Sequence, residues 1–124
     1  MNEPKKNYDL EERLIDFAIT IFNISEQLPN TRVGNHLAGQ IIRSGSSPAL
    51  NYSEAKSAES KNDFIHKMKV CLKELRETFV CLRMIKKKDL IKDLNLVDDA
   101  INENNELISI FVTSVNTASS KKTS

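Results

Sequence analysis

The residue types that most often carry catalysis or metal binding are scarce in this chain and do not cluster. The residue three positions before His36 is Val33, and that before His66 is Asp63. Di-iron helical bundles use Glu-x-x-His on two helices, and metalloproteases use His-Glu-x-x-His. The chain also lacks a glycine-rich loop of the phosphate-binding kind. We therefore expect no catalytic site, no metal site and no cofactor, and we expect that the protein is not an enzyme.

The two cysteines fall within one predicted helix, at positions 71 and 81. At ~1.5 Å per residue, this separation places them roughly 15 Å apart, which is too far for a disulfide within the helix. A pair of cysteines without histidines at ligand spacing does not make a zinc site. We expect Cys71 and Cys81 to act as small apolar packing residues.

Charge is the first property that points to a binding function. The formal net charge is only +1, but residues 61–92 carry ten basic and four acidic residues, while residues 93–118 carry five acidic residues and no basic one. Basic side chains along one helix can contact nucleic-acid phosphates, although a run of charge can also be an ordinary solvated helix face. The candidate nucleic-acid-binding residues are Lys61, Lys67, Lys69, Lys73, Lys86, Lys87, Lys88 and Lys92.

The element that positions these lysines is one of four predicted amphipathic helices. Apolar residues recur at alternating steps of three and four, the heptad spacing of helices that pack side by side. Long helices joined by short loops fold back on one another, so we expect an all-α, antiparallel, up-down-up-down four-helix bundle. The expected helices cover about residues 8–28, 31–57, 60–87 and 92–117.

The bundle is expected to form one domain over residues 8–117, because a chain of 124 residues is too short for two sizeable cores. Residues 1–7 are predicted to be a flexible N-terminus, and the Ser/Thr/Lys-rich residues 118–124 a disordered tail. Proline inside a helix costs roughly 3 kcal/mol, so the second helix is predicted to kink or break near Pro48.

The location of the protein is also predicted from hydropathy. The first residues are polar and charged, unlike a secretory signal. No stretch approaches the ~20 apolar residues that a membrane span requires. We therefore expect a cytoplasmic protein with no membrane association.

Apolar residues beyond the main stripes predict a subunit interface. Soluble monomers rarely expose large contiguous apolar patches, so this surplus favours a closed homo-oligomer. An irregular bundle that buries the surplus in its own core is the alternative. Cys81 lies on the side of the third predicted helix that faces away from the main apolar stripe of that helix. The interface candidates are Ile15, Ile19, Phe22, Val70, Met84, Leu107 and Ile110.

Several charged and polar residues sit close to the predicted inward stripes. Burial of a charge is costly unless the charge is paired, so these side chains are expected to form an interhelical network of ion pairs and hydrogen bonds. Such a network can fix the register of the helices, or part of it can line a ligand cleft. The predicted polar network comprises Arg43, Asn51, Glu54, Glu74, Arg76 and Glu77.

Four sequence runs carry a resemblance to a known family: LAGQIIRS at 37–44, NYSEA at 51–55, SKNDF at 60–64 and KELRET at 73–78. In order and spacing they resemble the 23S rRNA-intervening-sequence proteins, over about residues 8–115. The resemblance implies a four-helix bundle that assembles as a homopentamer. It also relates the chain to the accessory variability proteins of diversity-generating retroelements, which bind nucleic acid and a reverse transcriptase. The chain departs from the family pattern at Gly45 and Pro48, and at Val80 and Cys81, where the family commonly has aromatics.

Two binding functions compete at this stage. The first is binding of RNA, DNA or a ribonucleoprotein through the lysines of the third helix. The alternative is a scaffold for a partner protein, such as a reverse transcriptase or a ribosome-associated factor, for which the acidic fourth helix and the wide apolar faces are suited. Both use the oligomer as the binding unit.

Overall fold

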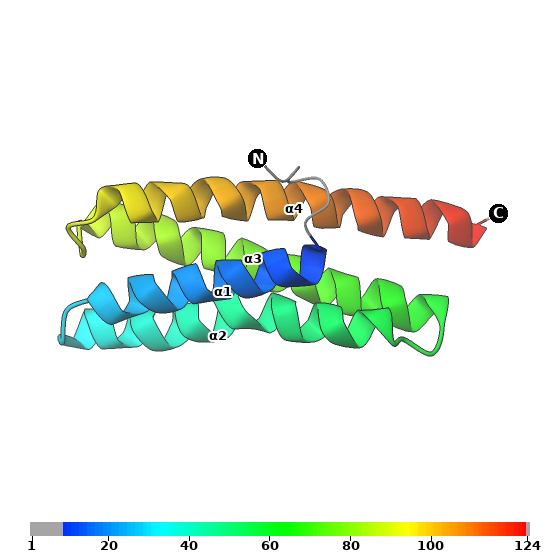
Figure 1. Ribbon diagram of the computed structural model, residues 1–124, viewed down its shortest axis with the longest axis horizontal. Coiled ribbons are helices and arrows are strands. Elements are labelled where there is room, and N and C mark those ends of the chain that lie inside the picture. The colour runs from blue at the N-terminus through cyan, green and yellow to red at the C-terminus, as the bar shows by residue number, and fades with distance from the viewer. Residues whose placement is uncertain (1–8, 124) are drawn as a thin grey trace, which may run out of the picture.

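The chain folds into four long helices that run alternately in opposite directions (Figure 1). The computed structural model describes residues 9–123, and this part of the chain contains no strand. The antiparallel four-helix bundle predicted from the heptad stripes is confirmed. The helices are α1 (Leu10–Gln27), α2 (Arg32–Lys56), α3 (Lys61–Lys88) and α4 (Leu94–Thr123).

Polar caps fix where the helices begin. The side chains of Thr31, Ser60 and Asp93 each accept a hydrogen bond from a backbone N–H of the first turn, at 3.0, 3.0 and 3.1 Å. Such caps satisfy donors that have no partner within the helix. At the other end of α3, Asp89 adopts a left-handed conformation with a φ of 60°, which stops the helix and turns the chain into α4.

The core is the seam between the four predicted stripes. Leu14 and Ile21 of α1 belong to the same buried apolar cluster as Leu75 and Leu82 of α3, and all four side chains are essentially inaccessible to solvent. Phe111 of α4 is also fully buried. These five residues, predicted to face inward because of their heptad spacing, therefore do face inward, whereas Val33 and Leu94 at the starts of α2 and α4 are exposed.

Helix α2 passes through Pro48 as a single helix. Of the two outcomes predicted for this position, a kink or a break, the break therefore does not occur. Neighbouring side chains engage backbone carbonyls around the proline. The Ser46 hydroxyl donates to the Ile42 carbonyl at 2.7 Å, and Asn51 Nδ2 donates to the Ser47 carbonyl at 3.0 Å. Pro48 is buried, and packing against the rest of the bundle offsets part of its cost to the helix.

Helix α4 is longer than predicted. It continues to Thr123, so residues 118–123, predicted to be a disordered tail, are helical. Serine and threonine are only modestly worse helix formers than alanine, so a helix already formed can continue through them. The predicted flexible N-terminus at residues 1–7 lies outside the described residues.

The helices differ in length. Helix α1 has 18 residues and α4 has 30, which correspond to about 27 Å and 45 Å at ~1.5 Å per residue. Figure 1 shows that α2, α3 and α4 all extend past the start of α1. One end of the bundle is therefore built from three helices.

Candidate nucleic-acid interface

Five cations share the outward face of α3. Lys69, Arg76 and Arg83 follow one another at seven-residue intervals, and Lys73 and Lys87 lie on the adjacent row, with Val80 between them. All five are exposed, and no acidic residue occupies these two rows over residues 69–87. We call this set the basic stripe. It runs over the 19 residues from 69 to 87, so its ends lie about 27 Å apart along the helix.

The cations of the basic stripe are not neutralised within the bundle. None of them forms an ion pair with a residue that the structure describes. The Arg83 guanidinium lies over the Phe79 ring, 5.8 Å from its centroid, which leaves the charge at the surface. The stripe is therefore open to an anionic ligand.

The remaining predicted lysines lie off this stripe. Lys67 pairs with Glu54 at 3.2 Å, and Lys86 pairs with Asp98 at 2.7 Å. Lys61 and Lys88 are exposed at the two ends of α3, and Lys92 is exposed in the loop before α4. The structure thus brings together Lys69, Lys73 and Lys87 of the predicted set.

Two members of the stripe are not among the binding candidates predicted from sequence. From sequence, Arg76 is predicted to belong to the polar network, and Arg83 is assigned to no site. The signal that could have found them is the exact seven-residue spacing of positions 69, 76 and 83, which places three cations on one row of a helix.

Arg43 of α2 connects two glutamates of α3. Its Nη1 lies 3.0 Å from Glu74 Oε1, its Nη2 pairs with Glu77, and Gln40 Nε2 donates to Glu77 at 2.9 Å. Glu74 is largely buried, and its hydrogen bond with Arg43 raises the pKa of the guanidinium. This cluster ties α2 to α3.

The other predicted members of the polar network lie elsewhere. Asn51 donates to Ser47 within its own helix, and Glu54 pairs with Lys67 rather than with Arg43. Arg76 is exposed and makes no ion pair with a described residue, so its place in the predicted network is wrong.

A second ion cluster was not predicted. Arg13 of α1 pairs with Glu103 and Glu106 of α4, each at 2.6 Å. The hydrogen bond with Glu103 raises the pKa of Arg13, so the cation persists at any pH that the protein tolerates. This cluster uses two of the acidic residues that make the fourth helix anionic.

The predicted interface residues divide by exposure. Ile15 and Ile19, one turn apart on α1, are 37% and 49% exposed, and Met84 of α3 is 45% exposed. Phe22, Val70 and Ile110 are half-buried.

Two apolar residues placed on the outside by their spacing are instead part of the core. Leu107 is fully buried, which removes it from the predicted interface, and Cys81 is only 3% exposed. A helix surrounded by two neighbours buries the positions that flank its central stripe as well as the stripe itself. The fourth helix therefore needs a wider apolar face than the heptad count assumes.

The two free thiols are buried in the core of the bundle. Burial raises the pKa of the Cys71 thiol to about 12, and it also raises the pKa of Cys81. Over the described residues, no three His, Cys, Asp or Glu side chains come together in a way that could hold a metal ion. None of the described helices is both long and apolar enough to cross a membrane.

Comparison with known proteins places the chain in a family. The family described as 23S rRNA-intervening sequence protein matches residues 6–113. A solved structure of a protein of unknown function from the S23 ribosomal protein family of Bacteroides thetaiotaomicron is similar to this chain. The two are 28% identical, with a TM-score of 0.78 over 86% of this chain and 98% of that one. No curated protein matches. The chain therefore belongs to the 23S rRNA-intervening sequence protein family.

Proposed function

We propose that this protein binds nucleic acid through the basic stripe of α3, without catalysing a reaction. The observation that carries the proposal is the run of exposed cations at 69, 73, 76, 83 and 87, which have no acidic neighbour on their rows and no described ion-pair partner. A free row of cations on a rigid helix is suited to contacts with successive phosphates, and such contacts stabilise binding without reading bases.

The chemistry of the stripe favours contact with the backbone over stacking with the bases. Stacking requires exposed aromatic rings, but Phe79 is half-buried beside Arg83. We expect binding to depend strongly on salt and weakly on sequence, and RNA and DNA of similar length to bind with similar affinity.

We also propose that the binding unit is a homo-oligomer, and the resemblance to the family makes a pentamer the expected form. The exposed Ile15 and Ile19 of α1 support this, because sister copies could cover them. A closed ring would present one basic stripe per subunit. Several stripes acting together would raise the affinity well above that of a single stripe.

The experiment compares two variants that lose the same charge. The stripe variant is Lys69→Gln, Lys73→Gln and Arg76→Gln. The control is Lys56→Gln, Lys67→Gln and Lys86→Gln, in which each lysine is already ion-paired off the stripe. At about 50 mM salt, fluorescence anisotropy with a short labelled RNA should show at least about tenfold weaker binding for the stripe variant and little change for the control.

An equal loss of RNA affinity in the two variants would show that only the overall charge matters and would contradict binding through the stripe. Absence of RNA binding by the wild-type protein at low salt would also contradict the proposal. Circular dichroism of both variants checks that the helices are intact.

A further inference from the structure

Among the described residues, 9–123, no helix continues the line of α1 beyond Leu10, so this part of the chain leaves the core seam uncovered at that end of the bundle. The start of α1 is fixed by the ion pair between Glu11 and Lys56 of α2. At this end Tyr52 of α2 packs edge-on against Phe111 of α4, with ring centroids 6.0 Å apart. Beyond Phe111, α4 continues for another 12 residues to Thr123, while α1 does not extend past Leu10.

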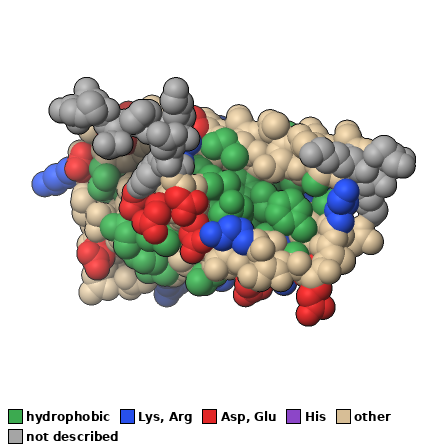
Figure 2. Space-filling view, turned by 45° about the vertical axis from the view of Figure 1, so that its right-hand side comes forward, with side chains coloured by type: hydrophobic (Ala, Val, Ile, Leu, Met, Phe, Trp, Pro, Cys, Tyr) green, Lys and Arg blue, Asp and Glu red, His purple; other side chains and the backbone are tan. Residues whose placement is uncertain are grey.

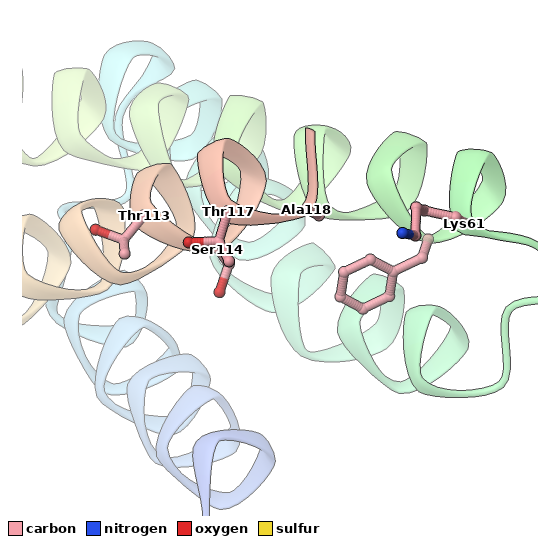
Figure 3. A pocket seen from close by; sticks show the side chains of 6 residues that line it. Lys61, Thr113, Ser114, Thr117 and Ala118 are labelled. Carbon is pink, nitrogen blue, oxygen red and sulfur yellow. The ribbon is translucent and has the colours of Figure 1, made fainter. Parts of the chain in front are cut away.

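A hollow of about 480 Å³ lies between α3 and α4 in this region. Figure 3 shows Thr113, Ser114, Thr117 and Ala118 on α4 and Lys61 on α3. The lining residues are Lys61, Phe64, Thr113, Ser114, Thr117 and Ala118.

The hollow continues the core rather than lying beside it. Phe64 precedes the fully buried Cys71 by seven residues, and Ala118 follows the fully buried Phe111 by seven. Both therefore occupy core positions of their helices, yet both are only half-buried. Figure 2 shows hydrophobic side chains gathered in the middle of this face, with both acidic and basic side chains beside them.

We propose that this open seam binds an amphipathic helix of a partner protein, which completes the fourth position of the bundle. The missing length corresponds to about 12 residues, or ~18 Å at ~1.5 Å per residue. Ser114 and Ala118 are small, so the hollow has room for bulky apolar side chains that project from the incoming helix at positions i, i+4 and i+7.

Charge gives the partner helix its direction. Lys61 is at the N-terminal end of α3 and makes no ion pair with a described residue. Among the described residues that line the hollow, it is the charged one. A partner with acidic residues in its first turn would place them at Lys61 if it ran in the same direction as α1. That direction is antiparallel to α2 and α4, and acidic residues in a first turn also suit the helix dipole. Helix α1 itself begins in this way, with Glu11 and Glu12.

The test uses a designed, fluorescein-labelled helical peptide with two glutamates in its first turn and leucines at i, i+4 and i+7. We expect saturable binding to the wild-type protein. The variant Ala118→Leu fills the hollow and should weaken binding at least about tenfold. The matched control Ser109→Leu places the same bulk on the exposed face of α4 and should leave binding unchanged.

A charge exchange tests the direction of the helix. Lys61→Glu should weaken binding of the acidic peptide about threefold, the size expected of a surface ion pair, and should improve binding of a peptide with lysines in place of the two glutamates. The reverse pattern, or no effect of the exchange, would overturn the proposed orientation.

Other occupants give different results and would overturn the proposal. If residues 1–8 of the same chain cover the seam, the peptide will bind only after their deletion. If a second copy covers it, Ala118→Leu will lower the mass measured by sedimentation. No saturable binding, or equal binding to the wild-type protein and Ala118→Leu, also rejects the partner helix. RNA binding by Ala118→Leu should stay unchanged, so this proposal and the basic-stripe proposal can fail separately.

Discussion

Polar side chains inside the bundle differ in how well their hydrogen bonds are satisfied. The Thr78 hydroxyl donates to the Glu74 carbonyl at 2.9 Å and hydrogen-bonds with the Ser44 hydroxyl at 2.8 Å. Asn104 of α4 is also fully buried, but neither polar atom of its amide has a hydrogen-bond partner among the described residues. A buried amide without partners lowers the stability of the fold, because it loses its hydrogen bonds to water on folding.

Replacement of this amide by an apolar side chain of similar size should stabilise the protein. We expect Asn104→Leu to raise the free energy of unfolding by about 1–2 kcal/mol, measured by urea denaturation. Thr78→Val is the contrasting substitution, since it removes a satisfied hydroxyl and leaves Ser44 without that partner. A less stable Asn104→Leu protein would mean that the amide makes stabilising interactions in solution.

The Cys71 thiol should make stability fall at alkaline pH. Burial raises its pKa to about 12 from the ordinary thiol value of 9.0, and its Sγ lies 3.5 Å from the Pro48 carbonyl, to which only the protonated thiol can donate. The folded protein therefore holds this proton more tightly than the unfolded chain. The stability contribution is complete below pH 9 and is lost as the pH rises toward 12.

We expect the stability difference between the wild-type protein and Cys71→Ala to shrink by at least about 1 kcal/mol between pH 8.5 and pH 10.5. Urea denaturation of both proteins across this range measures it, and the comparison cancels the titration of other groups. Parallel stability curves would show that the thiol ionises as easily in the folded as in the unfolded protein.

At the scale of the helices, two glycines of α2 have opposite surroundings. A Cβ at Gly45 would lie 2.7 Å from Ile21 Cγ2 of α1, closer than side chains tolerate. A Cβ at Gly39 would meet nothing within 4 Å. Gly45 therefore permits the close approach of α1 and α2, whereas Gly39 only weakens the helix.

These surroundings predict opposite effects of the same substitution. Gly39→Ala should stabilise the protein by about 0.5–1 kcal/mol, since alanine is the better helix former. Gly45→Ala should destabilise it by about 1–3 kcal/mol, because the buried Ile21 cannot move freely. Thermal unfolding followed by circular dichroism measures both. Equal changes in the unfolding temperature of the two variants would contradict the close contact between α1 and α2.

The helices themselves could be predicted from sequence because their signals are local. The heptad spacing of Leu14, Phe17 and Ile21 shows an inward face, and Thr31 and Ser60 mark helix starts by their side-chain chemistry. The continuity of α2 through Pro48 could not be predicted in this way, because it depends on packing against helices that are distant in the sequence.

The candidate site could be predicted only in part for a related reason. The sequence shows that the third helix is rich in lysine, but whether a lysine is free depends on the acids that other helices bring to it. Lys67 meets Glu54 of α2, and Lys86 meets Asp98 of α4. The burial of Leu107 likewise reflects the two neighbours of α4, and spacing within a single helix does not reveal them.

Across the whole molecule, charge is segregated rather than absent. Acidic residues of α4 form ion pairs with Arg13 and Lys86. The outward cations of α3 form no ion pair with a described residue. The formal net charge of +1 therefore conceals a basic face. Phosphate contacts depend on this local distribution more than on the total.

The salt dependence of RNA binding tests the basic stripe most directly. The logarithm of the association constant should fall linearly with the logarithm of salt concentration, between about 50 and 200 mM. For each stripe that contacts the RNA, neutralising Lys69, Lys73 and Arg76 should reduce this slope by about two, at ~0.7 per phosphate contact on a single strand. The off-stripe control should keep the wild-type slope. Identical slopes for all three proteins would contradict binding through the outward face of α3.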